Sequence, residues 1–200
     1  MEQNAQVTGL RGAAAKRVRI SIVLGVWGLF YCCYRAYYAL GGTFGMFGTP
    51  VSHEQWLMVN AFGAGILLVA AVLPVATLPL WRRSHGRRVL QALCWAVTVG
   101  CVMHALINGI QRVLSLAGVM HLDLPFWTTI DHRTADLQDL LFNEPWFLVE
   151  GLLWAWLAMA SLSAGRARRR WLISAGVAIA VLTAVGMLSA TGVIGTFIVG

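Results

Sequence analysis

The stretch ISIVLGVWGLFYCCYRAYYAL, residues 20–40, is apolar over most of its length. The hydrocarbon core of a bilayer is crossed by about 20 helical residues, so this stretch is long enough to span it. Its second half nevertheless carries Arg35 and all four tyrosines of the chain. We therefore predict a transmembrane helix with polar chemistry at one end.

Four further runs of this kind follow along the chain, and together they indicate a membrane protein. Of the 200 residues, 58% are hydrophobic and only 12% are charged, and the mean hydropathy is +0.71. A soluble domain of this size has too little interior to bury so much apolar surface. We predict an all-α polytopic bundle with a single domain at 20–199, whose five transmembrane helices lie at about 20–40, 56–80, 89–111, 145–163 and 171–199.

The basic residues predict how the helices are oriented. Twelve of the fifteen Lys and Arg residues lie before the first run, between the second and third runs, or between the fourth and fifth. By the positive-inside rule these three segments face the cytoplasm, so the positive charge does not indicate a nucleic acid partner. We expect residues 1–19 to be a cytoplasmic segment, residues 41–55 and 112–144 to be outer loops, and the carboxyl terminus to lie outside.

The composition and the first run predict the location of the protein. The chain has one Lys against fourteen Arg and is rich in Ala and Gly, which is typical of a GC-rich bacterial genome. The first run has no small-x-small cleavage site and no lipobox, so we expect it to be retained as a helix. We predict a multi-pass protein of a bacterial plasma membrane, with the lipid bilayer as its surroundings.

Polar side chains within the apolar runs are confined to one layer of the outer half. Counted at 1.5 Å per residue from the outer ends of the predicted helices, Arg35, Asn60 and Glu150 each lie about 7–9 Å deep. Such side chains are costly in lipid, so we expect this layer to face protein or a water-filled cavity. The third run contributes polar positions that share one face about 80° wide: Cys94, Cys101, His104, Asn108 and Arg112.

Glu150 is the only carboxylate inside an apolar run, so it requires a partner. Arg35 and Arg112 lie at comparable or shallower depth, and we expect one of them to pair with it. Tyr38 and its neighbouring tyrosines share a face with Arg35, which would bring phenol groups to the same place.

These positions predict a polar pocket that opens toward the outer leaflet. We expect it to bind or process a small amphipathic ligand such as a lipid or isoprenoid, with arginines suited to an anionic head group. His104 and Glu150 are the candidate proton carriers and hence the candidate catalytic residues, although whether the protein is an enzyme, and which cofactor it uses, stays open. The other lining residues are the candidate ligand-binding residues: Arg35, Tyr38, Asn60, Asn108 and Arg112.

A purely structural role is the alternative for the same layer. Asn and His side chains bond between helices in membranes, and Arg side chains reach up to the head groups. The protein would then be an accessory or assembly subunit of a larger membrane complex, with a membrane-protein partner or a second copy beside it. A channel or carrier is disfavoured because the second and fifth runs offer no matching polar positions in their cytoplasmic halves.

Metal and nucleotide sites are also disfavoured. His104 is the only histidine inside an apolar run, whereas a haem held by two histidines requires both at similar depth. The outer loops carry imidazoles and carboxylates, but none of their spacings is typical of a metal site. The glycine-rich loop 41–48 lacks the lysine of a phosphate-binding loop.

The end of the second outer loop predicts a short helix of its own. In residues 134–142, Asp136 and Asp139 lie on one side and leucines on the other, a spacing typical of an interfacial helix. Asn143 would then cap the next helix, with Glu144 and Pro145 in its first turn.

Three segments together resemble a family of small bacterial multi-pass membrane proteins of unknown function. They are Tyr38-Ala-Leu-Gly-Gly-Thr43, the basic connection before the third run, and Asn-Glu-Pro-Trp-Phe at residues 143–147. In that family an aromatic-x-Leu-Gly-Gly-Thr segment follows the first helix. The resemblance covers residues 20–163 and implies a four-helix pattern, from which the fifth run departs, and it implies no function.

Overall fold

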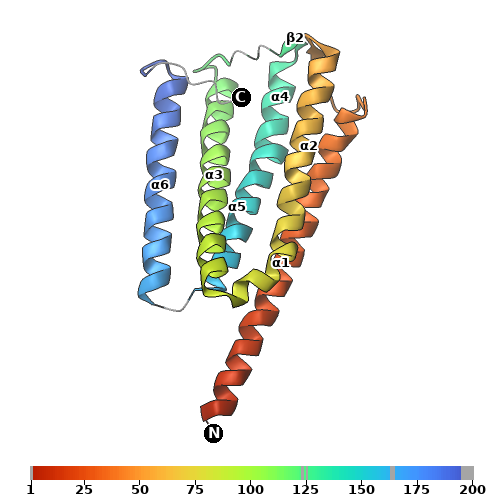
Figure 1. Ribbon diagram of the computed structural model, residues 1–200. Helices are drawn as coiled ribbons and strands as arrows, with labels where there is room; N and C mark the ends of the chain where they lie inside the picture. The colour runs from red at the N-terminus through yellow and green to blue at the C-terminus, as the bar shows by residue number, and fades with distance from the viewer. Residues whose placement is uncertain (1, 123, 125, 163–164, 195–200) are drawn as a thin grey trace.

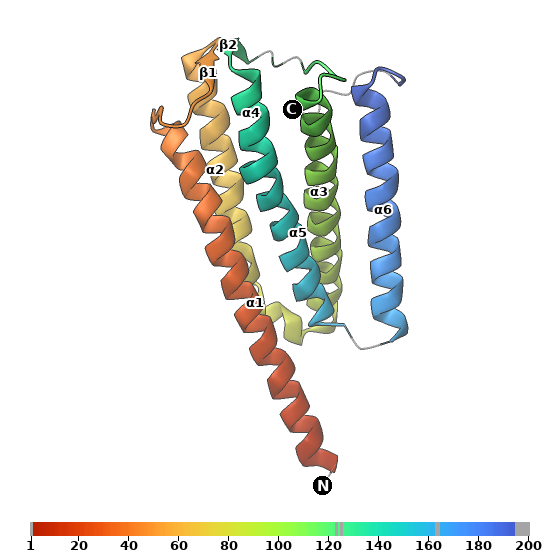
Figure 2. The ribbon, with the colours of Figure 1, turned by 180° about the vertical axis from the view of Figure 1, so that it is seen from behind.

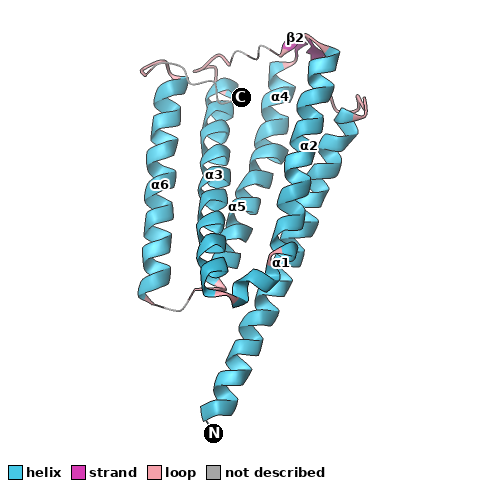
Figure 3. Ribbon diagram, in the orientation of Figure 1, coloured by secondary structure: helices cyan, strands magenta, loops and turns pink. Residues whose placement is uncertain are grey.

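The computed structural model describes residues 2–122, 124, 126–162 and 165–194, and of residues 2–11 only the backbone. Long helices run side by side (Figure 1), and strands occur at one end of the bundle (Figure 3), which we call the sheet end. The elements of the described residues are α1 (Glu2–Ala39), β1 (Gly48–Pro50), α2 (His53–Ala76), the 3-10 helix η1 (Leu78–Arg82), α3 (Ser84–Leu116), β2 (Trp127–Ile130), α4 (His132–Gln138), the π-helix η2 (Asp139–Asn143), α5 (Glu144–Met159) and α6 (Arg166–Ala190).

Four of these helices are long and apolar enough to cross a membrane: the part of α1 from Gly12 to Ala39, and all of α2, α3 and α6. They fall on four of the predicted runs, although α6 ends at Ala190 and residues 195–199 lie outside the described residues. The remaining predicted helix, 145–163, corresponds to α5, which is too short to count as a span when taken alone. The all-α prediction is confirmed, and the four apolar helices support a membrane protein.

The predicted break before α5 does not occur. Helix α4, the π turn η2 and α5 follow one another directly, and Asn143 has helical dihedral angles and makes no capping bond with its side chain. The helix predicted over residues 134–142 is present as α4 and η2, but its separation from the next helix and the cap at Asn143 were predicted wrongly. Pro145 explains the π turn, because its ring clashes with the carbonyl four residues earlier and removes a hydrogen bond, which a wider turn accommodates.

The helices of the bundle do not all pack closely against their neighbours, and the looser contact is between α2 and α3. Helix α1 packs along α2, α3 packs along α5 and α6, and α1 touches α5, whereas α2 and α3 make little direct contact. Gly151 of α5 permits a close approach to Thr98 and Cys101 of α3. The apolar core of the described residues joins α1, η1, α3 and α5: Ile20, Leu24, Trp81, Leu90, Cys94, Trp154, Leu157 and Ala158. Figure 1 shows η1 at the end of the bundle away from the sheet.

The two long connections at the sheet end are tied together rather than free. Strands β1 and β2 pair antiparallel, with Gly48 opposite Ile130, and they cover the ends of α2 and α4 (Figure 2). Asp131 caps α4 by accepting hydrogen bonds from the backbone N–H and the hydroxyl of Thr134, which hold the pKa of this carboxyl below its ordinary value. The sheet and this cap fix where α4 enters the bundle.

Candidate functional site

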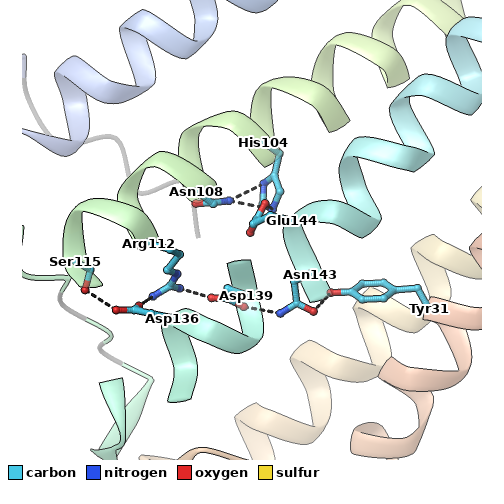
Figure 4. Close-up of polar contacts among 9 residues, drawn as sticks. All are labelled: Tyr31, His104, Asn108, Arg112, Ser115, Asp136, Asp139, Asn143 and Glu144. Carbon is cyan, nitrogen blue, oxygen red and sulfur yellow. Dashed lines mark hydrogen bonds and ion pairs between the residues drawn. The ribbon is translucent and has the colours of Figure 1, made fainter. Parts of the chain in front are cut away.

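Figure 4 shows polar side chains of α1, α3, α4, η2 and α5 close to one another, and Asn60 of α2 joins them through Arg35, which lies over the ring of Tyr31. They come from α1, α2, α3 and the continuous helix formed by α4, η2 and α5. We call this set the polar cluster, and it consists of Tyr31, Arg35, Asn60, His104, Asn108, Arg112, Ser115, Asp136, Asp139, Asn143 and Glu144.

The first part of the cluster is centred on Arg112. Its Nη1 lies 2.8 Å from Asp136 Oδ1 and its Nη2 lies 2.5 Å from Asp139 Oδ2. Ser115 Oγ donates to the second oxygen of Asp136 at 2.6 Å, and Asp136 is only 2% exposed. We call these four residues the closed part, because each charge in it already has partners. The expectation that Arg112 is free to hold a ligand or to pair with Glu150 is therefore replaced by a pairing within the protein.

Arg35 is held by a neutral partner. Its Nη1 donates to Asn60 Oδ1 at 3.0 Å, and its guanidinium carbon lies 5.7 Å from the ring centroid of Tyr31. Asn60 is fully buried and donates in turn to the backbone oxygen of Trp56 at 2.8 Å. Among the described residues no carboxylate forms an ion pair with Arg35, so the predicted pairing with Glu150 is also absent.

The second part of the cluster is centred on His104. Its Nε2 lies 3.9 Å from Glu144 Oε2, and Asn108 Nδ2 lies 3.0 Å from the same nitrogen. The side chain of His104 is 37% exposed, whereas that of Glu144 is 8% exposed. Glu144 Oε2 accepts no hydrogen bond from any described residue. We call His104, Asn108 and Glu144 the open part, because it joins a surface-accessible imidazole to a buried carboxylate oxygen that lacks a donor.

Glu150 lies deeper, six residues beyond Glu144 along α5. It is 3% exposed, its Oε1 accepts a hydrogen bond from Trp154 Nε1 at 2.7 Å, and its Oε2 has no hydrogen-bond partner in the described chain. No described contact joins it to His104. Of the two candidate catalytic residues, His104 thus belongs to the open part, and the acid beside it is Glu144 instead of Glu150.

The tyrosines of α1 divide between the cluster and the loop that follows. Tyr31 donates to Asn143 Oδ1 at 2.9 Å, and Asn143 bonds to Asp139, so a chain of contacts runs from Ser115 to Tyr31 (Figure 4). Tyr38, expected to line the pocket, is buried but donates to the backbone oxygen of Phe44. Its role in the structure is to hold the loop after α1.

Sequence reasoning named Asp136, Asp139 and Glu144 but did not assign them to the candidate site. Asp136, Asp139, Asn143 and Glu150 occupy one face about 60° wide when residues 132–159 are treated as a single helix. That periodicity was the available signal. The periodicity was not recognised, because a helix start was predicted at Asn143 and split the segment into two helices. Asn followed by Glu-Pro is typical of a helix amino terminus.

The described residues contain no group of three or more His, Cys, Asp and Glu side chains arranged to hold a metal ion. The rings of His121 and His132 lie 5.4 Å apart, and Asp123, which the outer loops also carry, lies outside the described residues.

Comparison with known proteins identifies one family. A family model described as "Protein of unknown function (DUF3995)" matches residues 29–154, which is more than half of the chain and includes every residue of the polar cluster. No curated protein and no solved structure matches the chain.

Proposed function

Because the chain belongs to the DUF3995 family, whose function is unknown, we propose from its geometry that it is an integral membrane protein that binds a small amphipathic ligand at the polar cluster. A lipid or isoprenoid is the class of ligand that fits a site within the apolar bundle. The observation that carries the proposal is the His104–Glu144 pair, in which a buried carboxylate oxygen without a donor adjoins a partly exposed imidazole. Such a group is costly in a bilayer unless something completes its hydrogen bonding.

The contrast between the two parts of the cluster supports binding over packing alone. In the closed part, Arg112 pairs with two carboxylates, and Ser115 donates a hydrogen bond to one of them, that of Asp136. This is expected for side chains that only hold helices together. In the open part, Glu144 lacks a donor although it is buried. Interhelical packing does not require a carboxylate in that state, whereas a polar head group would complete it.

The exposure of His104 supports access from the side of the bundle. Helices α2 and α3 make little direct contact, and α3 carries both His104 and Asn108, which are only partly buried. The surfaces of the helices are lined with large apolar side chains, such as Phe62 and Ile66. An apolar tail therefore fits the lipid side while the head group enters the open part.

We further propose five membrane crossings in a bacterial plasma membrane, with the amino terminus inside. The crossing in addition to the four apolar helices is the continuous helix His132–Met159, the fourth along the chain, which at 1.5 Å per residue is about 42 Å long and exceeds a hydrocarbon core of roughly 30 Å. The arginines of η1 and of the start of α6 lie at the end away from the sheet, which favours that end as cytoplasmic.

Reporter fusions test this topology. Alkaline phosphatase joined to the carboxyl terminus is expected to be active, because it is exported, and the same enzyme joined after Arg83 is expected to be inactive. Green fluorescent protein at the two positions is the control and is expected to show the opposite pattern. An inactive phosphatase together with a fluorescent protein at the carboxyl terminus would contradict five crossings.

Native mass spectrometry tests binding. The wild-type protein, extracted in mild detergent, is expected to retain a small amphipathic molecule. We expect His104→Ala and Glu144→Gln to reduce the occupancy of this molecule about tenfold or more. A hydrogen bond to a charged group contributes about 1.5–3 kcal/mol, and each variant removes such a group. Asp131→Asn is the control, because this exposed cap residue lies outside the cluster and Asn also caps helices. A wild-type protein that retains nothing, or variants that retain the molecule unchanged, would contradict the proposal.

The closed part favours one second candidate, a non-enzymatic accessory or assembly subunit whose polar layer holds its helices in register. This candidate predicts that the protein is recovered with a larger complex in the same spectra. Recovery of the protein alone with a retained small molecule would count against it.

A further inference from the structure

We infer that the open part of the polar cluster selects a head group that donates hydrogen bonds and carries no negative charge, namely a primary ammonium or a hydroxyl group. This inference rests on the proposed function, that an amphipathic ligand binds there, and adds the chemical class of the head. It reverses the expectation, drawn from the arginines alone, of an anionic head.

The contacts of the two arginines weaken the basis for binding an anion in the open part. Arg112 is occupied by Asp136 and Asp139, and both of its terminal nitrogens are engaged. Arg35 donates to Asn60 and lies over the ring of Tyr31. Among the described residues no arginine forms an ion pair with Glu144, and an anionic head would bring further acceptors to Glu144 Oε2 instead of the donor that it lacks.

In the open part of the cluster, the buried side-chain atom without a hydrogen-bond partner is an acceptor. Glu144 Oε2 is buried and lacks a donor, and its nearest charged partner, His104 Nε2, lies at 3.9 Å, beyond hydrogen-bond distance. Glu150 Oε2, deeper on the same helix, also lacks a donor among the described residues. A donor on the ligand is the group that completes a buried carboxylate, and an ammonium also matches its charge.

Three amphiphiles that share one alkyl tail test the selection: dodecylamine, dodecan-1-ol and dodecanoate. Thermal unfolding of the full chain is followed in detergent by tryptophan fluorescence at equal amphiphile concentrations. The amine and the alcohol are expected to raise the midpoint by about 2–4 °C, and dodecanoate is expected to leave it unchanged.

Two variants test whether the shift in unfolding midpoint arises at the open part, and whether the amine and the alcohol depend on Glu144 in the same way. Glu144→Gln removes the negative charge but keeps a carbonyl acceptor, so we expect it to abolish the shift caused by the amine and to retain part of the shift caused by the alcohol. Arg133→Gln, which changes an exposed arginine of α4 outside the polar cluster, is the control and is expected to leave both shifts as in the wild type. If Glu144→Gln does not fold, the comparison of the three head groups on the wild-type protein still decides the selection.

Stabilisation by dodecanoate that disappears in Arg35→Gln would overturn the inference and leave the proposed function standing. Equal stabilisation by all three amphiphiles, or by none of them, would also overturn the selection. The proposed function itself fails if the wild-type protein retains no small molecule in native mass spectrometry, or if His104→Ala and Glu144→Gln retain it unchanged, so the two failures are distinguishable.

Discussion

Arg112→Met is expected to destabilise the folded protein by about 3–5 kcal/mol, the largest effect among the substitutions that the polar cluster suggests. Methionine fills a similar volume but removes the charge that faces Asp136 and Asp139. Asp136 is almost completely buried, so its carboxylate would keep the cost of desolvation and lose its compensating partner. Unfolding in detergent, followed by heat or by denaturant, measures the loss.

Arg133→Met is the matched control, because Arg133 lies exposed on α4 and the substitution is chemically the same. We expect it to change stability by less than about 0.5 kcal/mol. The double variant Arg112→Met with Asp136→Asn is expected to lose less stability than the two single variants lose together. The second substitution removes the carboxylate that Arg112→Met leaves without a partner. Unchanged unfolding of Arg112→Met would show that the closed part contributes nothing to stability.

Gly151→Leu is expected to cost about 1–3 kcal/mol and to impair the open part at the same time. A Cβ at this position would lie 2.8 Å from Val102 Cγ2, which is closer than such atoms approach in folded proteins, and 3.2 Å from Cys101 Cβ, which is tighter than most such contacts. The carbonyl of Gly151 also accepts a hydrogen bond from Thr98. A larger side chain therefore pushes α5 away from α3, and these are the helices that carry Glu144 and His104.

The measurement combines unfolding in detergent with native mass spectrometry of the same preparation. Gly176→Leu is the control, since a Cβ at Gly176 on α6 meets nothing within 4 Å and leucine favours a helix more than glycine does. Loss of stability in Gly151→Leu with a fully retained small molecule would show that the spacing between α3 and α5 does not shape the site.

The candidate site was predictable in part of its contents but not in its pairings. Arg35, Asn60, His104, Asn108 and Arg112 were identified from their depth and helical spacing, and the structure places all five in the polar cluster. Their partners were assigned wrongly, because Glu150 was the only carboxylate inside an apolar run and no other acid was considered. Asp136 and Asp139 entered the bundle only because the chain continues as a helix through the π turn.

The amino-acid sequence by itself determined that the protein is helical, that it carries membrane-length apolar runs, and that polar residues gather in one layer. These properties depend on hydropathy and on a repeat of 3.6 residues per turn, and both are local. The tertiary structure decided which acid meets which base. That choice depends on the relative rotation and depth of two helices, which the close approach at Gly151 and the extra width of the turn at residues 139–143 set between α3 and α5.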